Sequence, residues 1–227
     1  VQYLTEQLHY SSATVNRDLQ LLEQMHRLRR SYGGVEPVRP APVPLPARYE
    51  KQKQVKKRIA RRAAEFVRAG DVIFVDGTTT TQYLAEYLVG KRNLTVITNN
   101  MALAAALSEA GVCCEVLGGR VAEPPSMLDG PATVEALMRL RADKCFFSTG
   151  RITPEGEIAI GNLFETVTRT MIDRAERSFL LVDGDKVGTA PRKTLCDLSC
   201  VHCVISDYRF PEPTQQRCRQ TEFVLVE

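Results

Sequence analysis

The chain has 227 residues, of which 44% are hydrophobic and 25% are charged, a composition typical of ordinary soluble globular proteins. No apolar run approaches the roughly 20 residues of a membrane-spanning helix, and no basic start leads into an apolar signal core. These features exclude a membrane protein and a secreted one from the classes we expect, and they predict a cytoplasmic protein with no membrane partner.

The net charge of +3 conceals a segregation of charge along the chain. Residues 1–62 carry 13 Lys and Arg against 5 Asp and Glu, whereas the remainder carries 17 against 22. A basic end on an acidic body is typical of a nucleic-acid-binding part attached to another domain. A solvated basic helix over residues 51–58 would produce much of the same excess, so both interpretations stay open.

The first predicted elements form a small head. Leu4 and Leu8 share one helical stripe, and Ser11 or Ser12 can cap a second helix. A hairpin is expected after that helix, before Gly33 and Gly34. The apolar face of the second helix is predicted to consist of Val15, Leu19, Leu22 and Met25.

This order of elements is typical of helix-turn-helix proteins, in which the second helix enters the major groove and residues near its start meet base edges. The hairpin would place a basic wing over the DNA backbone. A simple helical hairpin with a polar outer face fits the spacing equally well. The residues predicted to contact DNA are Ser11, Ser12, Thr14, Asn16, Arg17 and Gln20, together with Arg29, Arg30 and Tyr32 on the wing.

Prolines recur at every second or third position from Pro37 to Pro46. Such spacing removes backbone donors and favours an extended polyproline conformation. The domains we expect are therefore a DNA-binding head over residues 1–36, a semi-rigid linker over 37–47 and a large body over 48–227. Proline-rich segments also bind aromatic grooves, but a spacer explains this position better.

The body begins with a helical stripe from Val55 to Val67 and then shows a strand, turn and helix in succession. The apolar run Val72–Val75 leads into residues 76–81, Asp-Gly-Thr-Thr-Thr-Thr, which we call the threonine turn, and then into a helix. Backbone N–H groups and hydroxyls gathered at such a turn favour an anion. We expect that anion to be a phosphate, although threonine also caps ordinary helices.

Apolar runs and helical segments then alternate to the end of the chain, which predicts an α/β fold with a Rossmann-like, largely parallel sheet. Ligands of such sheets bind beyond the carboxyl ends of the strands. Asp76, Asn99, Gly118, Gly150 and Asp183 all follow predicted strands. The strands are expected at 72–75, 94–98, 114–117, 144–147, 179–182, 201–205 and 223–226, and the helices near 80–89, 101–110, 132–141 and 164–175.

The motifs together resemble the DeoR family of bacterial transcription regulators over residues 1 to about 207. In the head, the resemblance lies in Ser11–Leu19 and Arg29–Gly34. In that family a further helix precedes the helix-turn-helix, so the head is expected to be partial, or truncated. The body follows the order of the family's sugar-phosphate sensor domain through Asp76–Thr80, Leu94–Asn99, Leu117–Gly119, Ala142–Lys144, Glu165, Met171–Ile172 and Asp183–Lys186.

The resemblance implies a sugar-phosphate effector, and we assign the roles of site residues on that basis. Gly77, Thr78, Thr79, Thr80 and Thr81 would hold the phosphate, with Lys144 or Lys186 supplying positive charge. The remaining effector-binding candidates are Asp76, Asn99 and Glu165, which would bond sugar hydroxyls, and Gly118 and Gly150. By resemblance, ribose-5-phosphate isomerase and glucosamine-6-phosphate deaminase share the fold, so acid–base catalysis by Asp76, Lys144, Glu165 and Asp183 is the enzyme alternative.

The seven cysteines include Cys196, Cys200 and Cys203, whose C-x3-C-x2-C spacing resembles the cluster-binding loop of radical SAM enzymes. The run leads into a predicted strand and lies within the sensor-like region, so we expect reduced thiols and no metal or cofactor. The function expected from the sequence is therefore that of a DNA-binding regulator, a repressor of carbohydrate-metabolism genes, that acts as a homo-oligomer on operator DNA and senses a phosphorylated sugar.

Overall fold

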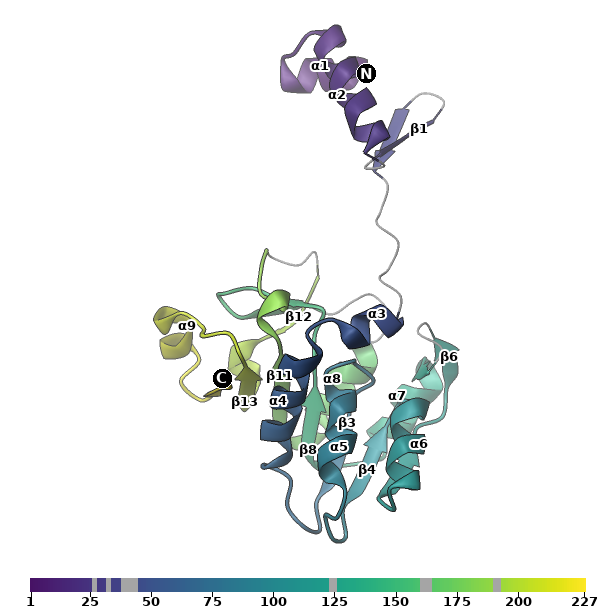
Figure 1. Ribbon diagram of the computed structural model, residues 1–227, viewed down its shortest axis with the longest axis vertical. Helices are drawn as coiled ribbons and strands as arrows, with labels where there is room; N and C mark the ends of the chain where they lie inside the picture. Colours follow the sequence, from purple (N-terminus) through teal and green to yellow (C-terminus); the bar gives the residue numbers. More distant parts are fainter. Residues whose placement is uncertain (26–27, 32–33, 38–44, 123–125, 160–164, 190–192) are drawn as a thin grey trace. The chain divides into compact units, whose positions relative to one another are not determined.

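The computed structural model describes the chain except for residues 26–27, 32–33, 38–44, 123–125, 160–164 and 190–192 (Figure 1). The chain divides into two compact units, Val1–Pro44 and Leu45–Glu227. We call the first the head and the second the sensor. No helix among the described residues is both long and apolar enough to span a bilayer.

The head contains two helices and a hairpin, in the predicted order. They are α1 (Gln2–Leu8), α2 (Ser12–Gln24), β1 (Leu28–Ser31) and β2 (Gly34–Pro37), and the two strands pair antiparallel. Ser11 is the N-cap of α2, because its side chain accepts a hydrogen bond from the backbone N–H of Thr14 at 3.2 Å.

The core of the head is smaller than the sequence predicted. Val15, Leu19 and Leu28 are buried, with Leu4 and Val35 packed against them. The prediction that Leu22 and Met25 complete the apolar face was wrong, since they are 39% and 60% exposed. Met25 lies beyond the last residue of α2, at its C-cap.

The sensor is built on a seven-stranded parallel sheet with the order β14-β13-β11-β8-β3-β4-β5. All seven strands lie where the apolar runs predicted them, which confirms the Rossmann-like α/β fold. Both faces of the sheet are covered, which explains why the strands are nearly continuous apolar runs. Their bounds are β3 Val72–Val75, β4 Thr95–Thr98, β5 Cys113–Val116, β8 Ala142–Phe147, β11 Ala175–Val182, β13 Cys203–Ser206 and β14 Glu222–Leu225.

Helices cover the sheet on two faces, and two separate hydrophobic clusters mark those faces. Along β3, Ile73 and Val75 belong to one cluster and Phe74 to the other, as the two-residue period of a strand requires. The first cluster packs under α4 (Lys53–Ala64), η1 (Thr81–Leu84), α5 (Ala85–Leu88) and α6 (Met101–Glu109). In Figure 1, α4 lies in front of the sheet near β11, and α5 lies near β3. The second cluster packs under α7 (Pro131–Met138) and α8 (Glu165–Asp173).

Several short elements were not predicted from the sequence. They comprise the hairpin of β6 (Arg120–Ala122) with β7 (Met127–Asp129), and the antiparallel sheet of β9 (Arg151–Ile152), β10 (Glu157–Ala159) and β12 (Thr194–Asp197). They also include η2 (Gly184–Lys186), η3 (Leu198–Cys200) and α9 (Glu212–Arg217).

The linker predicted over residues 37–47 differs from the structure at both ends. Pro37 belongs to β2, and a short helix, α3 (Leu45–Glu50), begins at Leu45, while 38–44 lie outside the described residues. Pro46 is compatible with α3 because the first turn of a helix needs no N–H there. The sensor therefore begins at Leu45 rather than at residue 48.

This boundary also relocates the basic charge. Residues 1–44 carry 5 Lys and Arg against 4 Asp and Glu, whereas residues 45–62, in α3 and α4, carry 8 against 1. The basic excess therefore belongs mainly to the sensor, and the head by itself is nearly neutral.

Candidate functional site

The strand order creates a switch point between β3 and β8. From β3 the chain proceeds to β4 and β5 on one side, and it then returns to β8 on the other side of β3. Connections that leave two neighbouring strands in opposite directions open a crevice at their carboxyl ends, where ligands of open α/β sheets bind. Asp76 follows β3 and Ser148 follows β8 at this point.

Asp76 holds the threonine turn in shape. One carboxylate oxygen accepts hydrogen bonds from the backbone N–H of Thr78 (3.1 Å) and from the hydroxyls of Thr78 (2.8 Å) and Thr81 (2.7 Å). The other oxygen accepts from the backbone N–H of Ser148 at 3.0 Å. Burial raises the pKa of the Asp76 carboxyl, and these four hydrogen bonds oppose the rise. Both oxygens are engaged within the protein, so Asp76 organises the site and is not free to bond a sugar.

The backbone of the turn offers donors to an anion. For the N–H groups of Gly77, Thr79 and Thr80, no hydrogen-bond acceptor is found within the described parts of the chain. Gly77 also sits against Met127, since a Cβ built there would lie 2.5 Å from the methionine Cε and 2.8 Å from its Cγ. Backbone amides without an acceptor among the described residues, gathered in one turn, are donors of the kind that binds phosphate.

Lys56 brings a positive charge to this turn, and the sequence analysis missed it. The residue lies in α4 and is only 2% exposed, and its Nζ donates to Thr79 Oγ1 at 3.2 Å and to the Arg48 carbonyl at 2.5 Å. Burial lowers the pKa of Lys56 to about 8, and the charge of Asp183 opposes that fall. A signal was present, because Lys56 precedes Ile59 and Ala63 at the three- and seven-residue spacing of the buried helical face.

Buried polar atoms without partners cluster at the same edge of the sheet. Asp183, which follows β11, is 1% exposed, and neither carboxylate oxygen has a hydrogen-bond partner among the described residues. Burial raises the pKa of Asp183, and the charges of Lys186 and Lys56 oppose the rise. Native proteins rarely leave such groups unsatisfied, so a polar ligand or ordered water belongs beside these atoms. The other unsatisfied atoms at this edge are Ser148 Oγ, Asn99 Oδ1 and Gln82 Oε1.

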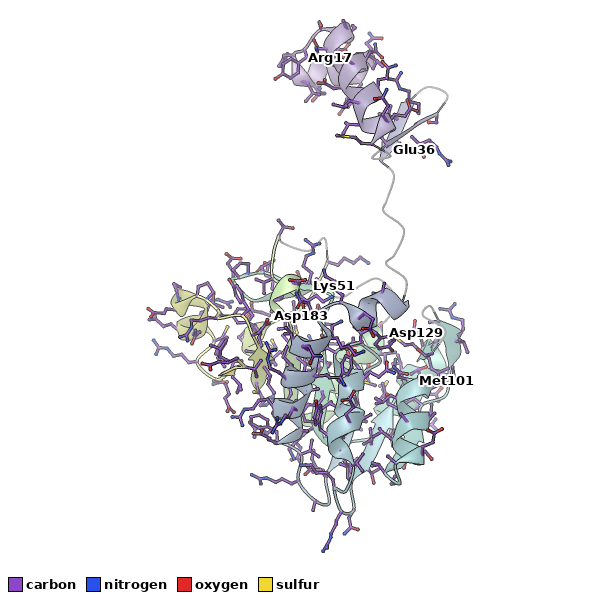
Figure 2. The ribbon with its side chains drawn as sticks, in the orientation of Figure 1. Arg17, Glu36, Lys51, Met101, Asp129 and Asp183 are labelled. Atoms are coloured by element: carbon purple, nitrogen blue, oxygen red, sulfur yellow. The ribbon has the colours of Figure 1, made fainter. Side chains whose placement is uncertain are left out.

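Of the other predicted effector residues, the structure brings Asn99 and Lys186 to this edge. The Asn99 amide donates to the Leu128 carbonyl at 3.0 Å, which leaves its oxygen free, and Lys186 in η2 lies close enough to affect the pKa of Asp183 and of Lys56. Gly150 is exposed, two residues beyond Ser148. Figure 2 shows Asp183 and Lys51 at this end of the sensor.

One predicted effector residue, Lys144, lies away from this group. Lys144 is buried three residues before the end of β8 and pairs with Asp71 at 2.5 Å, about 10 Å from the carboxyl end of its strand. The carbonyl of Gly118 accepts from the Thr133 hydroxyl at 2.7 Å, a bond that anchors α7. Glu165 is the first residue of α8, and its side chain lies outside those described.

The head presents most of the predicted DNA-binding residues on its surface. Thr14 is half-buried beside the Ser11 cap, and Arg30 pairs with Glu23 at 3.2 Å and donates to the Asn16 carbonyl at 3.2 Å. Tyr32 lies outside the described residues. Arg17 projects from α2 in Figure 2 with its side chain 80% exposed. The exposed residues are Ser11, Ser12, Asn16, Arg17, Gln20, Arg29 and Arg30.

The cysteines do not converge. All seven are free thiols, and within the described residues no three His, Cys, Asp or Glu side chains are placed to hold a metal ion. Cys196 lies in β12, Cys200 in η3 and Cys203 in β13, and burial raises the pKa of Cys196 and of Cys203 to about 12. Thiols that remain protonated are poor metal ligands.

Comparisons with known proteins cover both units. Residues 51–208 match the "DeoR C terminal sensor domain" and residues 1–40 the "DeoR-like helix-turn-helix domain". The chain is 29% identical to an L-fucose operon activator of Haemophilus influenzae over 98% of its own length and 91% of that protein's. It is 30% identical to a lactose phosphotransferase system repressor of Streptococcus mutans, over 99% and 91% respectively.

Among solved structures, ribose 5-phosphate isomerase A from Neisseria gonorrhoeae is similar over 61% of this chain and 55% of its own, at 13% identity and a TM-score of 0.46. The two domain matches, by contrast, together span almost the whole chain, in the order head then sensor. The chain belongs to the DeoR family of helix-turn-helix transcriptional regulators.

Proposed function

We propose that the threonine turn binds the phosphate of a sugar phosphate and that this binding changes the affinity of the head for operator DNA. The observation that carries the proposal is a buried lysine, Lys56, bonded to Thr79 beside three backbone amides for which the described part of the chain offers no acceptor. A buried ammonium with little counter-charge and a set of convergent donors both favour a doubly charged anion.

The neighbouring acceptors suit the sugar part of such a ligand. Asp183 and the oxygen of Asn99 can accept hydrogen bonds from hydroxyl groups, and the Ser148 hydroxyl can donate or accept one. Free polar groups on β4, β8 and β11 surround the end of β3, so one ligand at the switch point would satisfy several of them. This arrangement supports a polyhydroxylated phosphate ester over inorganic phosphate alone.

The outward side chains of α2 support DNA binding by the head. Asn16, Arg17 and Gln20 lie away from the core formed by Val15 and Leu19, on the face that a helix-turn-helix presents to base edges. We propose operator DNA as the partner, a cytoplasmic location and a homo-oligomer that places two heads on repeated half-sites. The two relatives are named for an activator and a repressor of sugar-related genes, and we propose that this chain represses carbohydrate-metabolism genes.

The regulator proposal fits the site better than the isomerase or deaminase alternative. That alternative names Asp76, Lys144, Glu165 and Asp183 as its acid–base set. Of these, Asp76 has both oxygens engaged by the turn and by Ser148, and Lys144 pairs with Asp71 away from the turn. The family is one of regulators, and we propose that this chain has no catalytic activity.

Calorimetric titration of the full chain with a panel of pentose, hexose, ketose and amino sugar phosphates tests the proposal. We expect at least one sugar phosphate to bind and its unphosphorylated sugar not to bind. Thr79→Asp, which places a carboxylate among the phosphate donors, should weaken binding at least about tenfold. The control is Thr166→Asp, at an exposed position of α8. Equal affinity of wild type and Thr79→Asp would remove the threonine turn as the phosphate site.

A further inference from the structure

Helix α3 occupies the position through which the sensor connects to the head. It is the first element of the sensor, beginning at Leu45 directly after the head unit ends at Pro44. The polypeptide therefore leaves the sensor through α3, and the placement of α3 decides where the connection to the head starts. In Figure 1, α3 lies at the end of the sheet where the parallel strands terminate.

Three contacts join α3, together with Lys51 directly after it, to residues near the threonine turn and Asp183. The three partner residues lie in three different elements, α4, η1 and η2, so a change in any of these elements can alter a contact with α3 or with Lys51. The contacts are Lys56 Nζ to the Arg48 carbonyl (2.5 Å), Tyr83 hydroxyl to the Tyr49 carbonyl (3.1 Å) and Lys51 Nζ to Asp185 Oδ2 (3.2 Å).

Lys56 is shared between α3 and the turn. Its ammonium group has three donors, and the described bonds, to Arg48 and Thr79, use two of them. An anion in the turn would accept from the third donor and would supply the counter-charge that this buried group lacks. Lys56 would then remain charged, and its charge-assisted bond to the Arg48 carbonyl would strengthen.

The junction between α3 and α4 permits α3 to move independently. Gln52, between the two helices, has φ 56°, in the left-handed region that residues other than glycine rarely adopt. The helical hydrogen bonding does not run through this residue, and α4 is fixed separately by Ile59, Ala60 and Ala63 in the core. Loss of the contacts that Lys56 and Tyr83 make with α3 therefore need not disturb α4 or the sheet.

We infer that α3 is the output element of the sensor: an anion in the threonine turn secures α3 through Lys56, and an empty turn leaves α3 free to undock and reposition the connection to the head. This inference rests on the proposed effector site and adds the route by which its occupancy is transmitted. Because coupling between two events is reciprocal, docked α3 must also strengthen anion binding.

Reciprocity gives a test that leaves the turn itself intact. Tyr83→Phe removes the hydroxyl that bonds the Tyr49 carbonyl, and Tyr87→Phe on α5 is the matched control, because no described bond joins its hydroxyl to α3. Inorganic phosphate is the probe, measured by calorimetry on the full chain together with hydrogen–deuterium exchange of the α3 amides. We expect phosphate to slow exchange in α3 of the wild type and of Tyr87→Phe.

In Tyr83→Phe, we expect faster exchange in α3 without phosphate and an affinity for phosphate that is about two- to tenfold lower, the loss typical of one hydrogen bond. Lys56→Met should also speed exchange in α3, and phosphate should no longer slow it. If phosphate binds the wild type but leaves exchange in α3 unchanged, the transmission route is wrong while the effector site stands. If phosphate binds wild type and Thr79→Asp equally, the effector site fails and the route fails with it.

Discussion

At the scale of single residues, Lys56 and Lys144 show that one residue type can serve two purposes. Both are buried lysines of the sensor. Lys144 has a carboxylate partner in Asp71 at 2.5 Å, whereas the partners of Lys56 among the described residues are a hydroxyl and a carbonyl. The pKa of Lys56 falls to about 8 because it is buried without a bonded anion, so its protonation is sensitive to what occupies the turn.

This difference predicts a pH dependence of anion binding. Lys56 is charged below its pKa of about 8 and neutral above it. The positive charge of Lys56 therefore attracts an anion in the turn only below about pH 8. Sulfate is a suitable probe because its own charge is constant across this range. We expect the calorimetric affinity for sulfate to be steady up to pH 7 and to fall as the pH rises through about 8.

The control for the pH dependence is Lys56→Met, which should bind sulfate weakly and with no step near pH 8. Lys57→Met, one residue further along α4, alters a surface lysine that pairs with Glu86 and should keep the wild-type profile. If the fall in sulfate affinity near pH 8 persists in Lys56→Met, the pH dependence belongs to another titrating group.

At the scale of elements, the ion pair of Lys144 with Asp71 links β8 to the residue that precedes β3. Replacing only one partner of a buried ion pair leaves an uncompensated charge, which costs about 3–5 kcal/mol. Lys144→Met should therefore lower the free energy of unfolding by about that amount in urea denaturation followed by circular dichroism. Sulfate affinity of the folded protein should stay close to wild type, because the pair lies away from the threonine turn.

The double variant Lys144→Met/Asp71→Leu provides the control for this prediction. It removes both charges, so it should recover much of the lost stability. A Lys144→Met variant that is stable but loses sulfate binding would contradict this account and would restore Lys144 as an effector residue.

The elements that the sequence predicted well are those with long, regular patterns. All seven sheet strands were predicted, because β3, β8 and β11 are nearly continuous apolar runs that are buried on both faces. The strands β9 and β10 have two and three residues, too few to show a period. Helix α3 was missed because Pro46 and the prolines before it favour an extended chain. The contacts of α3 with Lys56 and Tyr83 override that preference.

The site was predictable only in part. The threonine turn was predictable, because an apolar strand is followed directly by Asp-Gly-Thr. The structure places Asn99 and Lys186 at the same edge of the sheet. The roles of Lys56 and Lys144 did not follow from the sequence, because the partner of a charged side chain depends on which strands become neighbours. The register that sets Lys144 opposite Ile73, near the start of both strands, appears only in the folded sheet.

At the scale of the whole molecule, the two units divide the work proposed for the protein. The head carries exposed polar residues on α2, and the sensor carries a buried donor set with unsatisfied acceptors around it. The basic excess lies in α3 and α4 rather than in the head, and α4 is the helix that carries Lys56. A sugar phosphate can control DNA binding only if it prefers one arrangement of these parts over another.

The most direct measurement is the affinity of the full chain for a fluorescent DNA duplex, selected from a random library with this protein, with and without the sugar phosphate that binds it best. We predict that the sugar phosphate changes the dissociation constant at least about fivefold, the lower range of allosteric coupling. The unphosphorylated sugar should change nothing, and Thr79→Asp should bind the duplex without responding to the ligand. An affinity for DNA that is identical with and without the bound sugar phosphate would contradict the account.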